Sequence, residues 1–343
     1  MIEHLKSGLS ISTHMGCGLN CSYCILATMN GFNNGPVLQK EPEILIKELF
    51  YNYKYFLENE TPLMINNRTD PFLPKVTPYT LKILDLLIEY NITSPIVIIS
   101  KFAPPYALKK YFKKLDICYF YSYSGLKSDF NYNKVTEDLK IIKKIIPPES
   151  RFHYFRPIIP GVNDNVKYIR QILNLFYEHN FYASIISGFR VTNLNRHLIK
   201  DKTINVNHID YNHKLINNDI YNVNQWFKNK RYYIFRHTSC ALASHIQRFN
   251  KLNYFSKNNH CFTGCPNFNL CKTKKINLND ILIQLNKKFN GEYEFETNND
   301  KIVIVTPCTQ ELTAFIKNAF GCEVLAKKLK LSKSEEVILS EQK

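Results

Sequence analysis

The sequence has no long apolar run. Nowhere in its 343 residues does it approach the ~20 consecutive apolar residues that a membrane-spanning helix needs. Residues 1–4 also lack the basic and apolar segments of a secretory signal peptide. We therefore expect no membrane association and a cytoplasmic location.

The composition is also not that of a disordered chain, which would have low hydrophobicity and few aromatic residues. Hydrophobic residues make up 45% of the chain and aromatic residues 13%, as in a globular protein with an ample core. The net charge of +16 favours a polyanionic partner such as nucleic acid. The chain is also rich in Asn, Ile, Lys and Tyr, so a lysine-rich solvated surface is a second explanation of that charge.

Three cysteines, Cys17, Cys21 and Cys24, fall within eight residues, directly after an alternating run that predicts a strand over 9–14. A short glycine-containing loop lets the backbone curl until their sulfurs point inward toward one inorganic centre. Three thiolates cannot close a four-iron cluster, so the fourth iron stays open to an external ligand.

The alternatives are a structural zinc site and three unrelated buried thiols. Structural zinc normally takes four protein ligands, and no further Cys or His follows Cys24 closely. The whole chain has only 10 cysteines, so three of them within eight residues are not expected by chance.

With Tyr23 before the third cysteine, the segment resembles the signature of the radical S-adenosylmethionine (radical SAM) superfamily. The resemblance implies that Cys17, Cys21 and Cys24 hold a [4Fe-4S] cluster and that Tyr23 lies near its cofactor. In that family the open iron binds S-adenosylmethionine, and an electron from the cluster cleaves the cofactor to a 5′-deoxyadenosyl radical that removes a substrate hydrogen. It further implies an electron donor such as flavodoxin or ferredoxin.

Strands alternate with helices through the first two thirds of the chain. Strands are predicted over 9–14, 62–66, 95–101, 117–123, 152–158 and 182–188, and helices over 41–57, 77–90, 104–114, 134–146 and 165–179. Such alternation indicates an α/β fold with parallel βαβ units. Six units favour a partial (β/α)6 barrel over an open doubly wound sheet, and in either the active site lies at the carboxyl ends of the strands.

Polar residues follow the predicted second strand. The segment Thr69-Asp70-Pro71-Phe72 is turn chemistry, and it is also similar to the second-strand motif of the spore-photoproduct-lyase-like branch, often labelled DNA repair photolyases. That resemblance, which covers roughly residues 9 to 190, implies a role near the cofactor for Asn66 and Asp70. Four residues at the next strand ends either contact the cofactor's ribose or carboxylate or cap the following helices: Ser100, Lys101, Ser122 and Ser124.

The segment 155–164 carries the second resemblance. Pro160-Gly161 predicts a tight turn, and Asn163-Asp164 is expected to cap the next helix. The segment is similar to the fifth-strand motif of radical SAM proteins, which implies that Ile159 and Gly161 line the adenine. Arg156 is then expected to face the substrate.

A second group of cysteines follows the barrel: Cys240, Cys261, Cys265 and Cys271. Four thiols suffice for an auxiliary [4Fe-4S] cluster or a structural zinc, with His237 and His260 as alternative ligands, and free thiols are the third option. The spacing lacks the paired CxxC units of zinc ribbons, which favours the cluster.

Three cysteines stand alone in the sequence. Cys118 and Cys322 are expected to be small buried hydrophobes. Cys308 lies between a proline and a predicted helix, where a lowered pKa or hydrogen-atom donation would make it catalytic.

The predicted domains are a barrel over 1–236 with an irregular insertion at 190–229, an auxiliary-cluster segment over 237–275, and a small α+β domain over 276–343. We expect a radical SAM enzyme acting on a nucleic-acid base or nucleotide. The alternatives are radical SAM modification of a peptide or small metabolite, and a non-catalytic nucleic-acid-binding protein with structural metal sites.

Overall fold

The computed structural model describes residues 1–5, 7–126, 131–204, 214–215, 223, 226–227, 230–246, 277–299 and 301–329. Most of the predicted insertion, the segment that carries Cys261, Cys265 and Cys271, and the last residues of the chain lie outside this part. Within it, no helix is long and apolar enough to cross a membrane.

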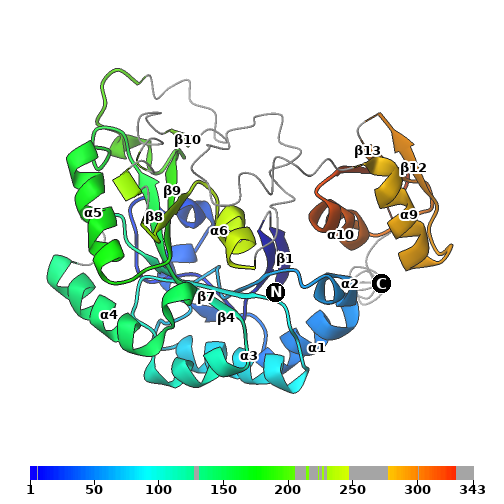
Figure 1. Ribbon diagram of the computed structural model, residues 1–343, viewed down its shortest axis with the longest axis horizontal. Coiled ribbons are helices and arrows are strands. Elements are labelled where there is room, and N and C mark those ends of the chain that lie inside the picture. The colour runs from blue at the N-terminus through cyan, green and yellow to red at the C-terminus, as the bar shows by residue number, and fades with distance from the viewer. Residues whose placement is uncertain are drawn as a thin grey trace.

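Among the described residues, a sheet of nine strands organises the larger part of the molecule (Figure 1). Neighbouring strands pair parallel in chain order: β2 (Gly8–Ile11), β5 (Leu63–Ile65), β6 (Ile96–Ser100), β7 (Ile117–Ser122), β8 (Arg151–Ile158) and β9 (Ala183–Arg190). Antiparallel strands border them at β1 (Ile2–Leu5) and β10 (Lys214–Leu215), and β11 (Tyr233–Phe235) runs parallel to β9. The predicted α/β class with a mostly parallel sheet is confirmed.

The strand order favours one of the two predicted architectures. A doubly wound sheet reverses its strand order at a switch point, whereas here each strand is added beside the one before it. Right-handed crossovers then place the connecting helices on one side of the sheet. Figure 1 shows α1, α3, α4 and α5 in an arc around the strands. This arrangement is consistent with a partial barrel.

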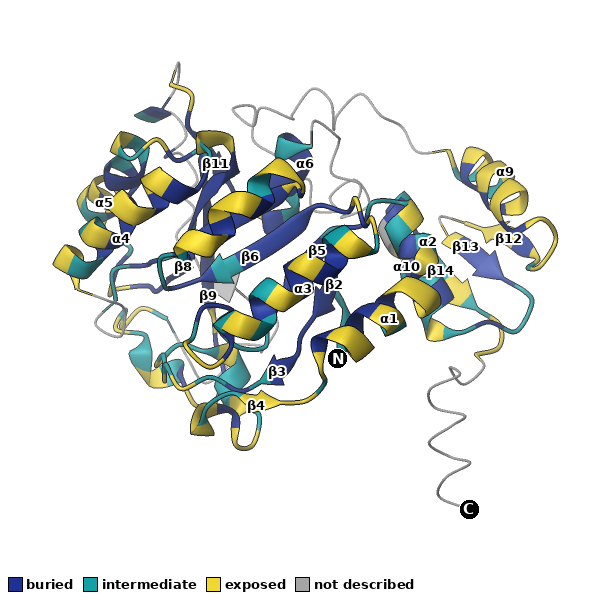
Figure 2. Ribbon diagram, turned by 90° about the horizontal axis from the view of Figure 1, so that it is seen from below, coloured by how far each residue is buried: buried dark blue, intermediate teal, exposed yellow. Residues whose placement is uncertain are grey.

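The outer helices are α1 (Pro42–Asn52), α2 (Lys54–Glu58), α3 (Thr77–Glu89), α4 (Tyr132–Ile145) and α5 (Val166–Glu178). Each turns an apolar face to the sheet and a polar face to solvent (Figure 2). The helix predicted over 41–57 is interrupted at Tyr53, whose ring is buried. The one predicted over 104–114 is the 3₁₀ helix η3 (Tyr106–Lys113), whose buried residues Leu108 and Tyr111 are three apart, the period of that helix.

The two faces of the sheet belong to different apolar clusters. Along β7, Tyr119 and Tyr121 face the outer helices, while Cys118 and Phe120 face the inner side. Helix α6 (Thr238–His245) covers that inner side, with Ala241 and Leu242 buried in the inner cluster. Both faces are therefore covered, as a parallel sheet requires.

The short elements lie in the connections. They are β3 (His14–Met15), β4 (Val37–Leu38) and the 3₁₀ helices η1 (Ile25–Thr28), η2 (Phe32–Asn34), η4 (Pro148–Ser150) and η5 (Arg196–Leu198).

The carboxyl-terminal part forms a small α+β unit. Helices α9 (Leu278–Phe289) and α10 (Gln310–Phe320) pack on a sheet of β12 (Phe295–Asn298), β13 (Lys301–Ile304) and β14 (Glu323–Ala326). It rests against α2, where the Phe56 and Phe315 rings lie 5.4 Å apart and Lys288 pairs with Glu58 at 2.7 Å. The predicted domain boundaries stay a prediction.

For Cys308 the structure contradicts the predicted lowering of the thiol pKa, and the predicted hydrogen-atom donation stays a prediction. The residue is 1% exposed in the core of this unit. Burial raises the pKa of its thiol, so the expected lowering is wrong. Cys118 and Cys322, 0% and 1% exposed, are buried as predicted.

Candidate active site

The loop that carries Cys17, Cys21 and Cys24 is closed by two short strands, because β3 and β4 pair antiparallel across its ends. Gly16 has φ +96°, and a Cβ there would lie 2.4 Å from the Gly35 carbonyl oxygen, so this position requires glycine. The backbone N–H of Cys17 donates to the carbonyl of Phe32 at 2.7 Å. These contacts fix the place from which the first thiol projects.

All three thiols of this loop are partly exposed. Burial raises the pKa of the Cys17 thiol, and the charges of Asp70 and Cys24 add to that rise. Hydrogen bonds from the backbone of Leu19 and Asp70 oppose it. Accessible thiols in one loop, one of them held by backbone N–H groups, fit the ligand set of an iron–sulfur cluster.

The cysteine loop contacts the carboxyl ends of the central strands. Tyr23 packs with Ile159 and Phe189 in a small apolar cluster where β8 and β9 end. The ammonium of Lys101, just after β6, lies 5.2 Å from the centroid of the Tyr23 ring, within cation–π range. Tyr23, Lys101 and Ile159 were predicted as site residues from three separate segments. The structure places them together.

Asp70 joins the end of β5 to the end of β6. Its side chain, 6% exposed, accepts hydrogen bonds from the Ser100 hydroxyl at 2.7 Å and from the backbone N–H groups of Lys101 at 2.8 Å and Phe72 at 2.9 Å. Burial raises the pKa of this carboxyl, against the effect of those bonds and of the Lys101 charge. Asp70, Ser100 and Lys101 therefore form one cluster beside Cys17.

Asn66 joins the end of β5 to β2 and α3. Its side-chain oxygen accepts from the Thr13 N–H at 2.8 Å and the Thr13 hydroxyl at 3.0 Å, and its amide donates to Thr80 at 2.8 Å. The residue is fully buried and has φ +50°, which asparagine tolerates better than most residues. Its contacts orient the loop that carries Asp70.

The predicted turn after β8 forms, with different contacts from those expected. Gly161 has φ +72°, and a Cβ there would lie 2.7 Å from the backbone nitrogen of Asp201. The chain's own backbone therefore lies where a side chain at this position would project, and the predicted contact of Gly161 with the adenine stays a prediction. Ile159 is 1% exposed in the apolar cluster with Tyr23.

The helix cap is displaced by one residue from its predicted position. Asn165 caps α5, accepting from the N–H of Lys167 at 2.9 Å. Asn163 instead accepts from the Ile159 N–H at 2.6 Å and donates to the carbonyl of Ser124 at 2.9 Å. It therefore anchors the turn to the end of β7.

The remaining predicted residues lie at the ends of β7 and β8. Ser122 is half-buried and Ser124 fully buried. Arg156 follows Tyr154 on the inner side of β8, donating to its hydroxyl at 2.5 Å with the guanidinium 4.8 Å from the ring centroid. Arg156 is partly exposed and lies near the carboxyl end of β8, and its predicted role toward the substrate stays a prediction.

The second cysteine group is described only in part. Cys240 lies on α6 and packs against the inner apolar cluster. Cys261, Cys265, Cys271 and His260 lie outside the described residues. The auxiliary cluster stays a prediction.

Three contributors to this end of the sheet were not predicted. Thr13 and Thr80 hold Asn66, and Arg68 makes a two-pronged ion pair with Glu3 at 2.6 and 2.8 Å. The signal that was available was the position of Thr13 and Arg68 close to the ends of buried strands, within three residues of the ends of β2 and β5. Their partners lie up to 65 residues away in the sequence, so residue spacing could not predict which side chains pair.

Comparison with known proteins gives distant similarity only. No protein-family profile matches the chain, and no curated protein matches its sequence. A spore photoproduct lyase complexed with dinucleoside spore photoproduct superposes with TM-score 0.49 at 11% identity, over 68% of this chain and 78% of that one. A mutant of that lyase with bound AdoMet and dinucleoside spore photoproduct gives 0.48 at 12%, over the same shares. Both TM-scores lie below 0.5, so we take nothing about this chain from these structures.

Proposed function

We propose that this chain is a radical SAM enzyme whose [4Fe-4S] cluster is held by Cys17, Cys21 and Cys24. The observation that carries the proposal is the position of these three partly exposed thiols, in one loop packed against the carboxyl ends of parallel strands. That edge is where α/β sheets bind ligands.

The other residues of the site have roles that follow from their contacts. Asp70 positions Ser100 and Lys101, and Asn66 positions the loop after β5. Tyr23 and Ile159 provide an apolar wall that excludes water. Cluster and cofactor, when bound, would supply the one-electron chemistry that removes a hydrogen from the substrate, with electrons from a donor such as flavodoxin or ferredoxin.

For the substrate we propose a nucleic-acid base or nucleotide. The support is the net charge of +16 together with cationic groups at this end of the sheet, Lys101 after β6 and Arg156 at the end of β8. Arg156 lies beside the Tyr154 ring, and a cation next to an aromatic ring can contact both a phosphate and a base face.

The proposal is tested by anaerobic purification followed by reaction with S-adenosylmethionine and dithionite. We expect brown, iron-loaded protein that forms 5′-deoxyadenosine. A colourless protein that contains only zinc would contradict the proposal that the chain is a radical SAM enzyme.

The substrate is tested separately, by adding damaged and undamaged DNA and RNA to the same reaction. We expect at least one of these polymers to accelerate cofactor cleavage. If none does while cleavage itself persists, the enzyme stands and the nucleic-acid substrate is rejected.

A further inference from the structure

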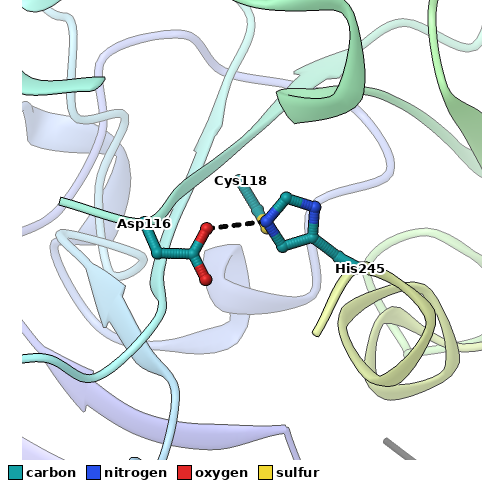
Figure 3. Close-up of side chains that lie close together, drawn as sticks. All are labelled: Asp116, Cys118 and His245. Atoms are coloured by element: carbon teal, nitrogen blue, oxygen red, sulfur yellow. Dashed lines mark hydrogen bonds and ion pairs between the residues drawn. The ribbon is translucent and has the colours of Figure 1, made fainter. Parts of the chain in front are cut away.

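A second group of metal-ligating side chains lies at the opposite end of the strands from the cysteine loop. Asp116 directly precedes β7, Cys118 is the second residue of that strand, and His245 ends α6 (Figure 3). Parallel strands begin at the edge opposite to their carboxyl ends, so this group lies at the amino-terminal end of the sheet. It has no part in the proposed cofactor site.

The three side chains converge although they come from distant segments. One donor atom from each, the Cys118 sulfur, an imidazole nitrogen of His245 and a carboxylate oxygen of Asp116, lie within 4.8 Å of one another. The Nε2 atom of His245 is 2.6 Å from Oδ1 of Asp116, across 129 residues of sequence. Figure 3 shows the imidazole directed at the carboxylate with the Cys118 sulfur close behind.

We propose that Asp116, Cys118 and His245 bind a divalent transition-metal ion, for which zinc is the best match. Thiolate, imidazole and carboxylate are all zinc ligands, and bonds of about 2.0 to 2.3 Å place tetrahedral donors roughly 3 to 4 Å apart. Binding would lengthen the 2.6 Å separation between Nε2 of His245 and Oδ1 of Asp116 by roughly 1 Å, and would shorten any separation near the 4.8 Å limit. Hard ions such as Mg²⁺ and Ca²⁺ prefer oxygen donors, which disfavours them here.

The surroundings suit three protein ligands and one exchangeable ligand. Cys118 is fully buried, whereas the side chain of Asp116 is 42% exposed, so water can reach the carboxylate side of the ion. On binding, the Cys118 thiol releases its proton to solvent, and the proton that Nε2 of His245 donates to Asp116 also leaves, to solvent or to Nδ1, so that the Nε2 lone pair can bind the metal. A site that keeps an open position of this kind exchanges a water.

Outer contacts hold the ligands in place. The His245 ring packs edge-on against Phe152, with 5.9 Å between ring centroids, and the imidazole also hydrogen bonds to the backbone of Glu149. Metal-bound histidines usually donate their second ring N–H to such a group. The backbone carbonyl of Asp116 accepts from the N–H of Ile96 at 2.7 Å, which fixes the start of β7.

The consequence is a link between α6 and the sheet. The rest of α6 is held on the inner side by apolar contacts of Ala241 and Leu242. A metal ion at its last residue would fasten the helix to β7 and stabilise the bound form by mass action.

The test is binding of zinc and of cobalt(II) to the full-length chain, compared with Cys118→Ala, Asp116→Asn and a matched control, Cys322→Ala. Cys322 is equally buried but belongs to no such three-ligand group among the described residues. We expect the parent and the control to bind one more ion per chain than Cys118→Ala. That extra cobalt should show a thiolate-to-cobalt charge-transfer band.

The difference in bound ions per chain between the parent and a variant does not include metal bound at the other cysteines, because both proteins share those sites. Equal stoichiometry and equal spectra in folded parent and folded Cys118→Ala would overturn the proposal. If Cys118→Ala fails to fold, Asp116→Asn decides, because its side chain is half-exposed and the change is conservative. We expect at least about tenfold weaker binding, since even outer-shell changes cost about 10- to 100-fold; unchanged affinity would overturn the proposal equally.

Discussion

The two ends of the parallel strands present cysteine in opposite ways. At the carboxyl ends, three partly exposed thiols come from one short loop shaped by Gly16. At the amino-terminal ends, the single thiol of Cys118 is fully buried on a strand and meets an imidazole and a carboxylate from other segments. Accessible thiols on a loop suit a cluster with an open iron, and a mixed group of one thiol, one imidazole and one carboxylate suits a single ion.

The difference teaches how each site depends on the fold. The loop needs the sheet only as a platform, because its ligands are close in sequence. The group at the other end exists only when α6 has docked, because Asp116 and His245 are 129 residues apart. Metal binding at the second group is therefore linked to tertiary structure more tightly than cluster binding at the first.

The largest effects are expected from two cysteine substitutions, which test whether the two sites bind metal independently. Cys24→Ala removes one of three loop ligands, and we expect complete loss of loop-bound iron and of 5′-deoxyadenosine formation. Cys118→Ala should keep that iron and lose the extra zinc or cobalt. Iron and zinc analysis with anaerobic assays measures both, and loss of both metals from either variant would show that the sites are not separate.

A smaller effect is expected from Asp70→Ala, which tests whether buried polar contacts support the carboxyl ends. Three donors lose their acceptor, and each buried unsatisfied group costs about 1 to 3 kcal/mol, so we expect a loss of about 3 kcal/mol or more. The control Asp164→Ala removes one exposed hydrogen bond, to the Gly161 N–H at 3.0 Å, and should cost less than about 1 kcal/mol. Urea unfolding measures both; equal losses would show that the Asp70 contacts add nothing.

Much of the fold could be predicted because its signals are local. Every strand of the six predicted units forms within a few residues of its expected place. Apolar periodicity and asparagine caps act over a few residues, so one sequence suffices to recognise them. The 3₁₀ character of η3 was missed because a short apolar spacing of three also fits an α-helix.

The strand ends that form the site were predictable, but its individual contacts were predictable only where the residues are neighbours in sequence. The cysteine loop is a continuous motif, whereas the contacts of Asn66 with Thr13 and Thr80 depend on which strands pair. Gly161 was recognised as a turn, but the backbone that packs on it, at Asp201, comes from a later segment. Tertiary partners of this kind leave no spacing rule in one chain.

The smallest effect is expected from alanine substitutions at Gly16 and Gly291, which separate the cost of a positive φ from the cost of a steric clash. Gly16 and Gly291 both have positive φ, +96° and +82°, but a Cβ at Gly16 meets the Gly35 oxygen at 2.4 Å whereas one at Gly291 meets nothing within 4 Å. Gly291→Ala should cost about 1 kcal/mol from φ alone, and Gly16→Ala about 2 kcal/mol because the loop must also shift. Gly16→Ala should lower the iron content of the loop and leave the metal at Asp116, Cys118 and His245 unchanged, because only the carboxyl end depends on this loop. Urea unfolding and metal analysis measure the two effects; if both variants lost the same stability and kept the same iron, the tight approach of Gly16 to Gly35 would have no part in shaping the cysteine loop.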